Sequence, residues 1–155
     1  HRDLHSFPTR RSSDLEIMLD GIPGNYEGHR FNFPGGWKED KRDAFSAEGR
    51  TAEENEIFNY LKTLLHYRKN NSVLHRGKMK HFVPENGIYV YFRYHDEKTV
   101  MVVANNNEDA SEVNLGRCNE MLAGKVSARD IMTNKNLSLK ESLSVPAKTV
   151  LVLEL

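Results

Sequence analysis

The chain has 155 residues, with 22 Lys and Arg against 22 Asp and Glu and a formal net charge of zero. This length is typical of one domain, and the neutral charge argues against a dedicated nucleic-acid-binding protein, which would carry a basic excess. No apolar run approaches the roughly 18 residues of a membrane span. The single cysteine, Cys118, excludes an internal disulfide and a multi-cysteine zinc site. We expect Cys118 to be a small buried apolar residue, and we predict no metal and no cofactor.

The first fifteen residues do not have the pattern of a folding segment. They carry three Arg without Lys and no periodic apolar positions. Their back-translation resembles a widely used sequencing-library adapter, and the alternative is a basic disordered tail. We therefore expect residues 1–15 to be a disordered adapter artefact outside the fold. The natural sequence would then begin at about Glu16, in the middle of a longer protein.

Turn-forming residues dominate the next segment, 16–50. Pro23-Gly24 and Pro34-Gly35-Gly36 are typical of loop structure, and a loop this long is uncommon unless it lines a site or packs on a neighbour. Aromatic residues such as Trp37 lie within it. We predict a loop that its aromatic side chains pin onto a surface that this chain lacks.

Residues 51–70 have a strong helical pattern. Thr51 and Glu54 form a capping-box motif at the start, and acidic residues follow where the helix dipole is positive. Apolar residues then recur at 3.6-residue spacing, and Asn70 and Asn71 end the helix.

Beyond residue 77 the apolar period changes to two, which predicts strands. Turn residues in 84–87 and 95–98 would join the first three strands as hairpins, and 105–109 would form a polar turn. Short strands at such spacing are typical of an antiparallel sandwich, so we predict a small all-β domain over 78–155. The expected strands cover 78–83, 88–94, 99–105, 111–115 and 150–155, with weaker ones at 125–131 and 137–139.

An ordered series of motifs resembles one known family. The motifs are Phe33-Pro-Gly-Gly-Trp37, the helix ending Leu64-Leu-His-Tyr-Arg-Lys69, Gly77-Lys-Met-Lys-His-Phe-Val-Pro84 and Ile88-Tyr-Val-Tyr91. Together they look like the C-terminal part of a cyclomaltodextrinase or neopullulanase of the α-amylase superfamily. The resemblance implies an α+β fragment: the end of a (β/α)-barrel in 16–71, with loop 16–50 and helix 51–70, followed by an antiparallel β-sandwich C-terminal domain.

The resemblance also implies a reaction. The family cleaves α-glucosidic bonds with retention, through an Asp nucleophile and a Glu acid/base. Its catalytic carboxylates would lie upstream of Glu16, so we predict no catalytic residue in this chain and no activity of the chain alone. The partners implied are α-glucan oligosaccharides, bound through the missing barrel, and that barrel itself. We weigh two alternatives, a free-standing carbohydrate-binding or structural β module and an interaction module with no role toward sugars.

Two residues are candidates for contact with substrate. By resemblance, Arg30 lies where the family can place an Arg against glucose units, and a guanidinium offers several fixed donors to sugar hydroxyls. A surface ion pair or loop anchor is the alternative for Arg30. Trp37 could stack on a pyranose ring or anchor the loop by packing.

The tyrosines of 88–94 also suggest a sugar-binding stripe. Tyr89 and Tyr91 fall on one face of the expected strand and Tyr94 on the other. Packing within the core or across strands is the favoured interpretation of all three.

Overall fold

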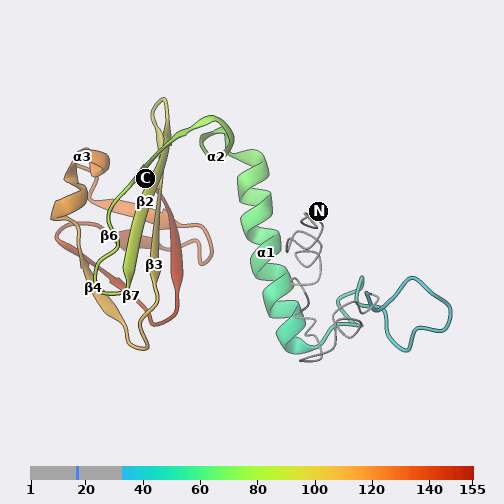
Figure 1. Ribbon diagram of the computed structural model, residues 1–155. Helices are drawn as coiled ribbons and strands as arrows, with labels where there is room; N and C mark the ends of the chain where they lie inside the picture. The colour runs from blue at the N-terminus through green and yellow to red at the C-terminus, as the bar shows by residue number, and fades with distance from the viewer. Residues whose placement is uncertain (1–16, 18–32) are drawn as a thin grey trace, which may run out of the picture. The chain divides into compact units, whose positions relative to one another are not determined.

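The computed structural model describes Ile17 and residues 33–155, so the expected adapter segment and Arg30 lie outside the described residues (Figure 1). The chain divides into two compact units, one running to Thr63 and the other covering Leu64–Leu155. The boundary falls within the long helix α1, Ala52–Asn70.

Helix α1 begins as the sequence predicts. The Thr51 hydroxyl accepts a hydrogen bond from the Glu54 N–H at 3.2 Å, and the Glu54 carboxylate accepts one from the Thr51 N–H at 2.8 Å. This reciprocal pair is a capping box, which satisfies two of the free N–H groups at the start of a helix. Acidic residues in the first turn and basic residues in the last turn match the helix dipole.

The apolar side chains of α1 find little cover within the described chain. Glu54 is its one buried residue, while Leu65 is 60% exposed and Tyr60 is also exposed. A helix is normally stabilised by burying its apolar face. The exposed apolar side chains of α1 are therefore typical of a helix that packs on further protein.

The second unit is mostly antiparallel sheet (Figure 1). One sheet has six strands in the order β1-β2-β3-β8-β5-β6, and the other pairs β4 with β7. The strands are β1 Lys78–His81, β2 Ile88–His95, β3 Lys98–Asn105, β4 Ser111–Asn114, β5 Ser127–Asp130, β6 Asn136–Ser138, β7 Ser142–Val145 and β8 Val150–Glu154. Three short helices complete it: α2 Ser72–Arg76, the 3-10 helix η5 Gly116–Cys118 and α3 Asn119–Leu122.

Both predicted hairpins are present. Strands β1 and β2 pair with His81 opposite Tyr91, and the connecting turn has Asn86 and Gly87 in the left-handed region at φ 50° and 75°. Strands β2 and β3 are joined through Asp96, which is also left-handed. Turn residues that tolerate positive φ thus set the register of the first three strands.

The core lies against the inner face of the large sheet. Fully buried side chains from β2, β3, β7 and β8 meet there, with Phe92 the largest of them. Cys118 is completely buried in this core, as expected, and burial raises the pKa of its thiol. The core cluster consists of Val90, Phe92, Met101, Val103, Val113, Leu115, Cys118, Leu122, Ala128, Leu139, Leu143, Val145, Leu151 and Leu153.

One buried amide fastens the loops at the end of the sandwich. The Asn105 side-chain amide donates to the carbonyl oxygens of Asp109, Val145 and Pro146, each at 3.0 Å. Its Oδ1 accepts from the Asn107 N–H at 2.9 Å. The sequence predicts only a polar turn here, whereas the structure shows a buried residue that joins two loops far apart along the chain.

Candidate functional site

The loop that carries Trp37 is shaped by Asp40. The Asp40 carboxylate accepts hydrogen bonds from the N–H groups of Gly35 and Trp37, at 3.0 and 3.1 Å, and the Asp40 N–H donates to the Trp37 carbonyl oxygen. Gly35 and Gly36 adopt φ of +118° and +95°, which side-chain-bearing residues rarely adopt. The turn presents Trp37 outward, with 71% of its surface exposed.

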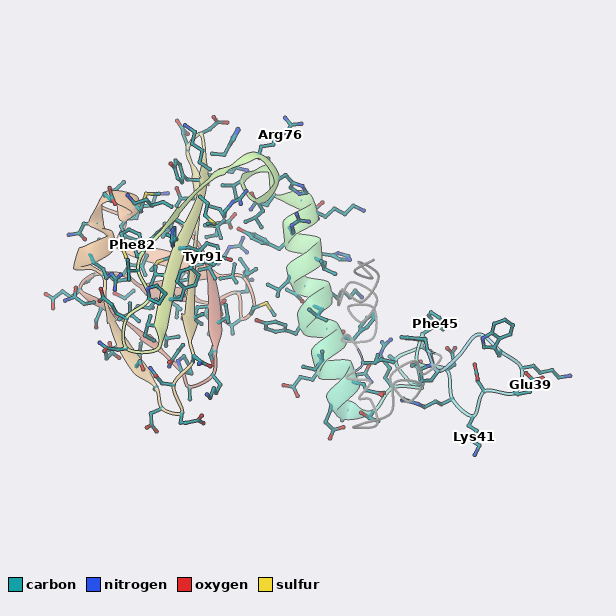
Figure 2. All side chains as sticks on the ribbon, in the orientation of Figure 1. Glu39, Lys41, Phe45, Arg76, Phe82 and Tyr91 are labelled. Atoms are coloured by element: carbon teal, nitrogen blue, oxygen red, sulfur yellow. The ribbon has the colours of Figure 1, made fainter. Side chains whose placement is uncertain are left out.

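The two ends of this turn meet at an aromatic pair. The rings of Phe33 and Phe45 lie 4.6 Å apart, and the Ala44 N–H donates to the Pro34 carbonyl oxygen at 2.8 Å. A Cβ on Gly35 would lie 2.5 Å from the Asp43 carboxylate. The two segments of the loop therefore approach too closely for a side chain at Gly35. Figure 2 shows Glu39, Lys41 and Phe45 along this loop.

An ion pair fixes the loop to the start of α1. The Arg42 guanidinium donates to both oxygens of the Glu54 carboxylate, at 2.6 and 2.8 Å. This two-pronged geometry gives both strength and orientation. The pKa of Glu54 is lowered, first by the hydrogen bonds from Arg42 and then by the Thr51 N–H, and the pKa of Arg42 is raised by the same pair. Glu54 therefore caps the helix and anchors the loop at once.

Arg50 supplies a second attachment. Its guanidinium lies 3.8 Å from the centre of the Phe58 ring, donates to Asn55 Oδ1 at 2.9 Å and donates to the Ala44 carbonyl oxygen at 2.9 Å. The Asn55 amide in turn donates to the Ala47 carbonyl oxygen. Residues 42–50 are therefore held against the first two turns of α1 at several points.

The structure places the sequence candidates as follows. Trp37 lies at the exposed tip of the loop, so it does not serve as a packing anchor within the described chain. The carboxylates of Asp40 and Asp43 accept backbone hydrogen bonds within the loop, and Glu48 is exposed. Arg30 lies outside the described residues.

Sequence reasoning does not find Arg42 and Arg50, because their partners lie 12 and 8 residues away on a helix and no local motif encodes such contacts. The one local sign of such a contact was Glu54. A carboxylate has two oxygens, and the hydrogen bond from the Thr51 N–H needs only one of them, so Glu54 can also accept hydrogen bonds from a second residue.

The tyrosines of β2 divide between the two faces as predicted. Tyr91 packs on the outer face of the large sheet and stacks at 5.6 Å on Tyr89, which lies 6.2 Å from the His81 ring. Tyr91 thus has a packing role, while Tyr89 remains half-exposed.

Among the described residues, no group of three or more His, Cys, Asp or Glu side chains gathers in a way that could hold a metal ion. No helix in this part of the chain is long and apolar enough to cross a membrane.

Comparison with known proteins identifies the β domain. Residues 79–154 match the family model of the cyclo-malto-dextrinase C-terminal domain. The chain is similar in structure to an Anoxybacillus α-amylase, with a TM-score of 0.63 and 17% identity over 91% of this chain and 27% of that one. It is also similar to a Geobacillus thermoleovorans α-amylase solved with acarbose, with a TM-score of 0.59 and 22% identity over 77% of this chain and 26% of that one.

A maltogenic α-amylase from Thermotoga neapolitana has a TM-score of 0.53 and 16% identity over 67% of this chain and 26% of that one. The chain therefore spans about a quarter of the length of these solved structures, and at such identities the likeness shows the fold. Together with the family match, it confirms the resemblance seen in the sequence. Residues 79–154 thus match the family of the cyclo-malto-dextrinase C-terminal domain, and the chain shares its fold with part of these α-amylases.

Proposed function

We propose that this chain is the C-terminal part of an enzyme that hydrolyses α-glucan oligosaccharides. In this proposal 16–71 supplies the last loop and last helix of a (β/α)-barrel, and 78–155 is the β domain that follows. The match to the Anoxybacillus α-amylase carries the proposal, because 91% coverage extends well beyond the 79–154 family match. The exposed apolar side chains of α1 agree, since the outer helices of such a barrel pack on neighbours.

The chemistry would reside in the preceding part of the enzyme. Retaining hydrolysis needs two carboxyl groups across the scissile bond, one as nucleophile and one as acid and base. In the loop, the Asp40 and Asp43 carboxylates accept hydrogen bonds from backbone N–H groups. On α1, the Glu54 carboxylate pairs with Arg42. These three carboxylates therefore stabilise the local structure. We expect the chain alone to be inactive.

The loop would contribute to binding. In a barrel enzyme the loops at the C-terminal ends of the strands line the active site. A Trp held outward on a turn whose two ends are joined can stack on the apolar face of a pyranose ring with little loss of conformational entropy. Arg30 would donate to sugar hydroxyls from the same loop.

Replacing Trp37 by Ala in the complete enzyme should raise KM for maltooligosaccharides about tenfold, with kcat changed less, because a stacking contact made before the reaction is lost. Trp37→Phe should recover part of the affinity. Steady-state kinetics with maltotriose and maltoheptaose provide the measurement.

Lys41→Ala, a change at another exposed position of the loop, is the matched control and should leave KM unchanged. Unaltered KM in Trp37→Ala would remove Trp37 from the site while leaving the assignment of the enzyme intact. Hydrolysis by the 155-residue chain alone would contradict the proposal as a whole.

A second candidate is a free-standing carbohydrate-binding module. The half-exposed Tyr89 ring, which lies tilted against Tyr91 and edge-on to His81, is the observation that favours it. Titration of the isolated chain with maltoheptaose, followed by nuclear magnetic resonance, should show no binding under the main proposal. Saturable binding that is lost in Tyr89→Ala would favour the module instead.

A further inference from the structure

Asn86 and Gly87 form the tip of the hairpin between β1 and β2. Glu85 and Ile88 close the turn through two backbone hydrogen bonds, at 3.0 and 2.8 Å. The two residues between them have φ of 50° and 75°, the left-handed conformation that two-residue hairpin turns favour. They are the one Asn-Gly pair in the sequence, and both residues are exposed. The turn is therefore open to solvent at both positions.

This pair has the chemistry for spontaneous deamidation. The Gly87 nitrogen can attack Cγ of Asn86, because no side chain on Gly87 shields it and no described residue accepts a hydrogen bond from its N–H. A bond forms between this nitrogen and Cγ, the bond from Cγ to the side-chain amide nitrogen breaks, and ammonia leaves with the proton of the Gly87 N–H. Water then opens the resulting five-membered imide, which gives aspartate or isoaspartate at position 86.

The hairpin can reach the geometry of this attack while the core stays folded. Strand β1 lies at the edge of the six-stranded sheet, and all of its residues are exposed. Segments with few buried side chains open locally at a smaller free-energy cost than the whole domain. The main chain at Asn86 can therefore rotate until the Gly87 nitrogen meets Cγ.

Three loops meet at this turn. The Asn107 side-chain amide donates to the Asn86 carbonyl oxygen at 2.8 Å, and the Asn106 N–H donates to the Gly87 carbonyl oxygen at 2.9 Å. Lys148, in the loop before β8, donates from its Nζ to the Asn106 carbonyl oxygen at 2.8 Å. A Cβ on Gly87 would lie 2.1 Å from Asn107 Oδ1, so the joint has little spare room. Isoaspartate adds a methylene group to the main chain and would move both turn carbonyls away from their donors.

We propose that Asn86 is a site of spontaneous deamidation, and that its conversion to isoaspartate releases the joint between these three loops. The reaction needs only water as a co-reactant. It does not depend on the proposed function, because every residue involved lies in the β domain. Asn134 provides an internal comparison: it is also exposed and left-handed, at φ 59°, but Lys135 follows it in place of a glycine.

Incubation of the 155-residue chain in mildly alkaline buffer, followed by peptide mass spectrometry, measures the conversion rate at each Asn. Asn86 should convert about tenfold faster than Asn134, because glycine leaves the attacking nitrogen unshielded. Isoaspartate is distinguished from aspartate by its resistance to a protease that cleaves before aspartate. Equal rates at Asn86 and Asn134 would overturn the proposal.

Hydrogen exchange at the Asn106 amide tests the effect on the joint. After incubation this amide should exchange about tenfold faster than in the fresh chain, because its acceptor on Gly87 has moved. Conversion of Asn86 without this change would overturn the claim that the joint is released.

Asn86→Gly is the matched variant. Glycine keeps the left-handed conformation and the carbonyl oxygen that accepts from Asn107, but it has no side-chain amide to lose. Exchange at Asn106 should therefore stay constant in this variant throughout the incubation. Equal acceleration in the parent chain and in Asn86→Gly would show that deamidation of Asn86 is not the cause.

Discussion

Replacing Phe92 by Ala should lower the free energy of unfolding of the β domain by about 3–5 kcal/mol. Phe92 is the largest side chain of the core, has no exposed surface, and contacts the Phe82 ring edge-on at 5.9 Å. Its removal loses the transfer free energy of the ring and leaves a cavity, since Met101 on the neighbouring strand β3 and Leu153 on β8 beyond it cannot close it fully. Urea unfolding of the chain measures the loss.

Phe82→Ala serves as the comparison. Phe82 is only half-buried, with Lys80 and Arg117 over its ring, so its loss should cost clearly less than that of Phe92. Equal losses for the two variants would show that the core is not centred on Phe92. A loss below about 1 kcal/mol for Phe92→Ala would mean that the site collapses to fill the space.

Glu54→Ala should release loop 33–50 from α1. The free energy of local unfolding should fall by about 2–3 kcal/mol. Two contributions add up: the capping box loses its return hydrogen bond, and the Arg42 guanidinium loses both of its carboxylate acceptors. The Arg42 side chain is 36% exposed, so water recovers part of the second contribution. Hydrogen exchange at the amides of Ala44 and Asn55, both bonded in this region, is the measurement.

Glu56→Ala is the matched control, because Glu56 lies exposed on the same helix. Its exchange rates should stay at the level of the parent chain. Unchanged exchange at Ala44 in Glu54→Ala would show that Arg50 alone holds the loop.

The same ion pair predicts a pH dependence. The folded-state pKa of Glu54 is lowered from its ordinary value of 4.5, so its contribution to stability is complete above that value and is lost as pH falls through the folded pKa. Glu54→Gln should therefore exchange faster than the parent at neutral pH, and the difference should shrink as pH drops below about 4.5. A difference that persists at low pH would exclude the charge as its source.

Local patterns predicted the parts of the fold that have local causes. The capping box at Thr51 and the left-handed turn residues at Gly87 and Asp96 form as expected because each needs only neighbours in sequence. Strand β7 was missed, since its four residues alternate with serine and give a weak signal. Helix α2 was missed because five residues are too few for a periodic pattern.

The candidate site was less predictable. The expected aromatic attachment of the loop to a surface outside this chain stays a prediction, and sequence reasoning did not find that Arg42 and Arg50 attach the loop to α1. Such contacts depend on which groups the fold brings together, and sequence spacing does not encode that. The burial of Asn105, read from sequence as a turn residue, has the same origin: its three acceptors come from the turn that follows it and from the end of β7 with the residue after it.

The position of the unit boundary inside α1 has a consequence for how this β domain could be moved between proteins. Leu64 and Tyr67 pack on the outer face of the sheet although they belong to the preceding helix, and α2 completes that layer. A graft that began at Lys78, where the first strand starts, would leave Val100, Val102 and Val152 facing water. The transferable module therefore includes the end of a helix whose beginning serves another unit, so an exchange of this domain between enzymes has to preserve the helix as a shared part.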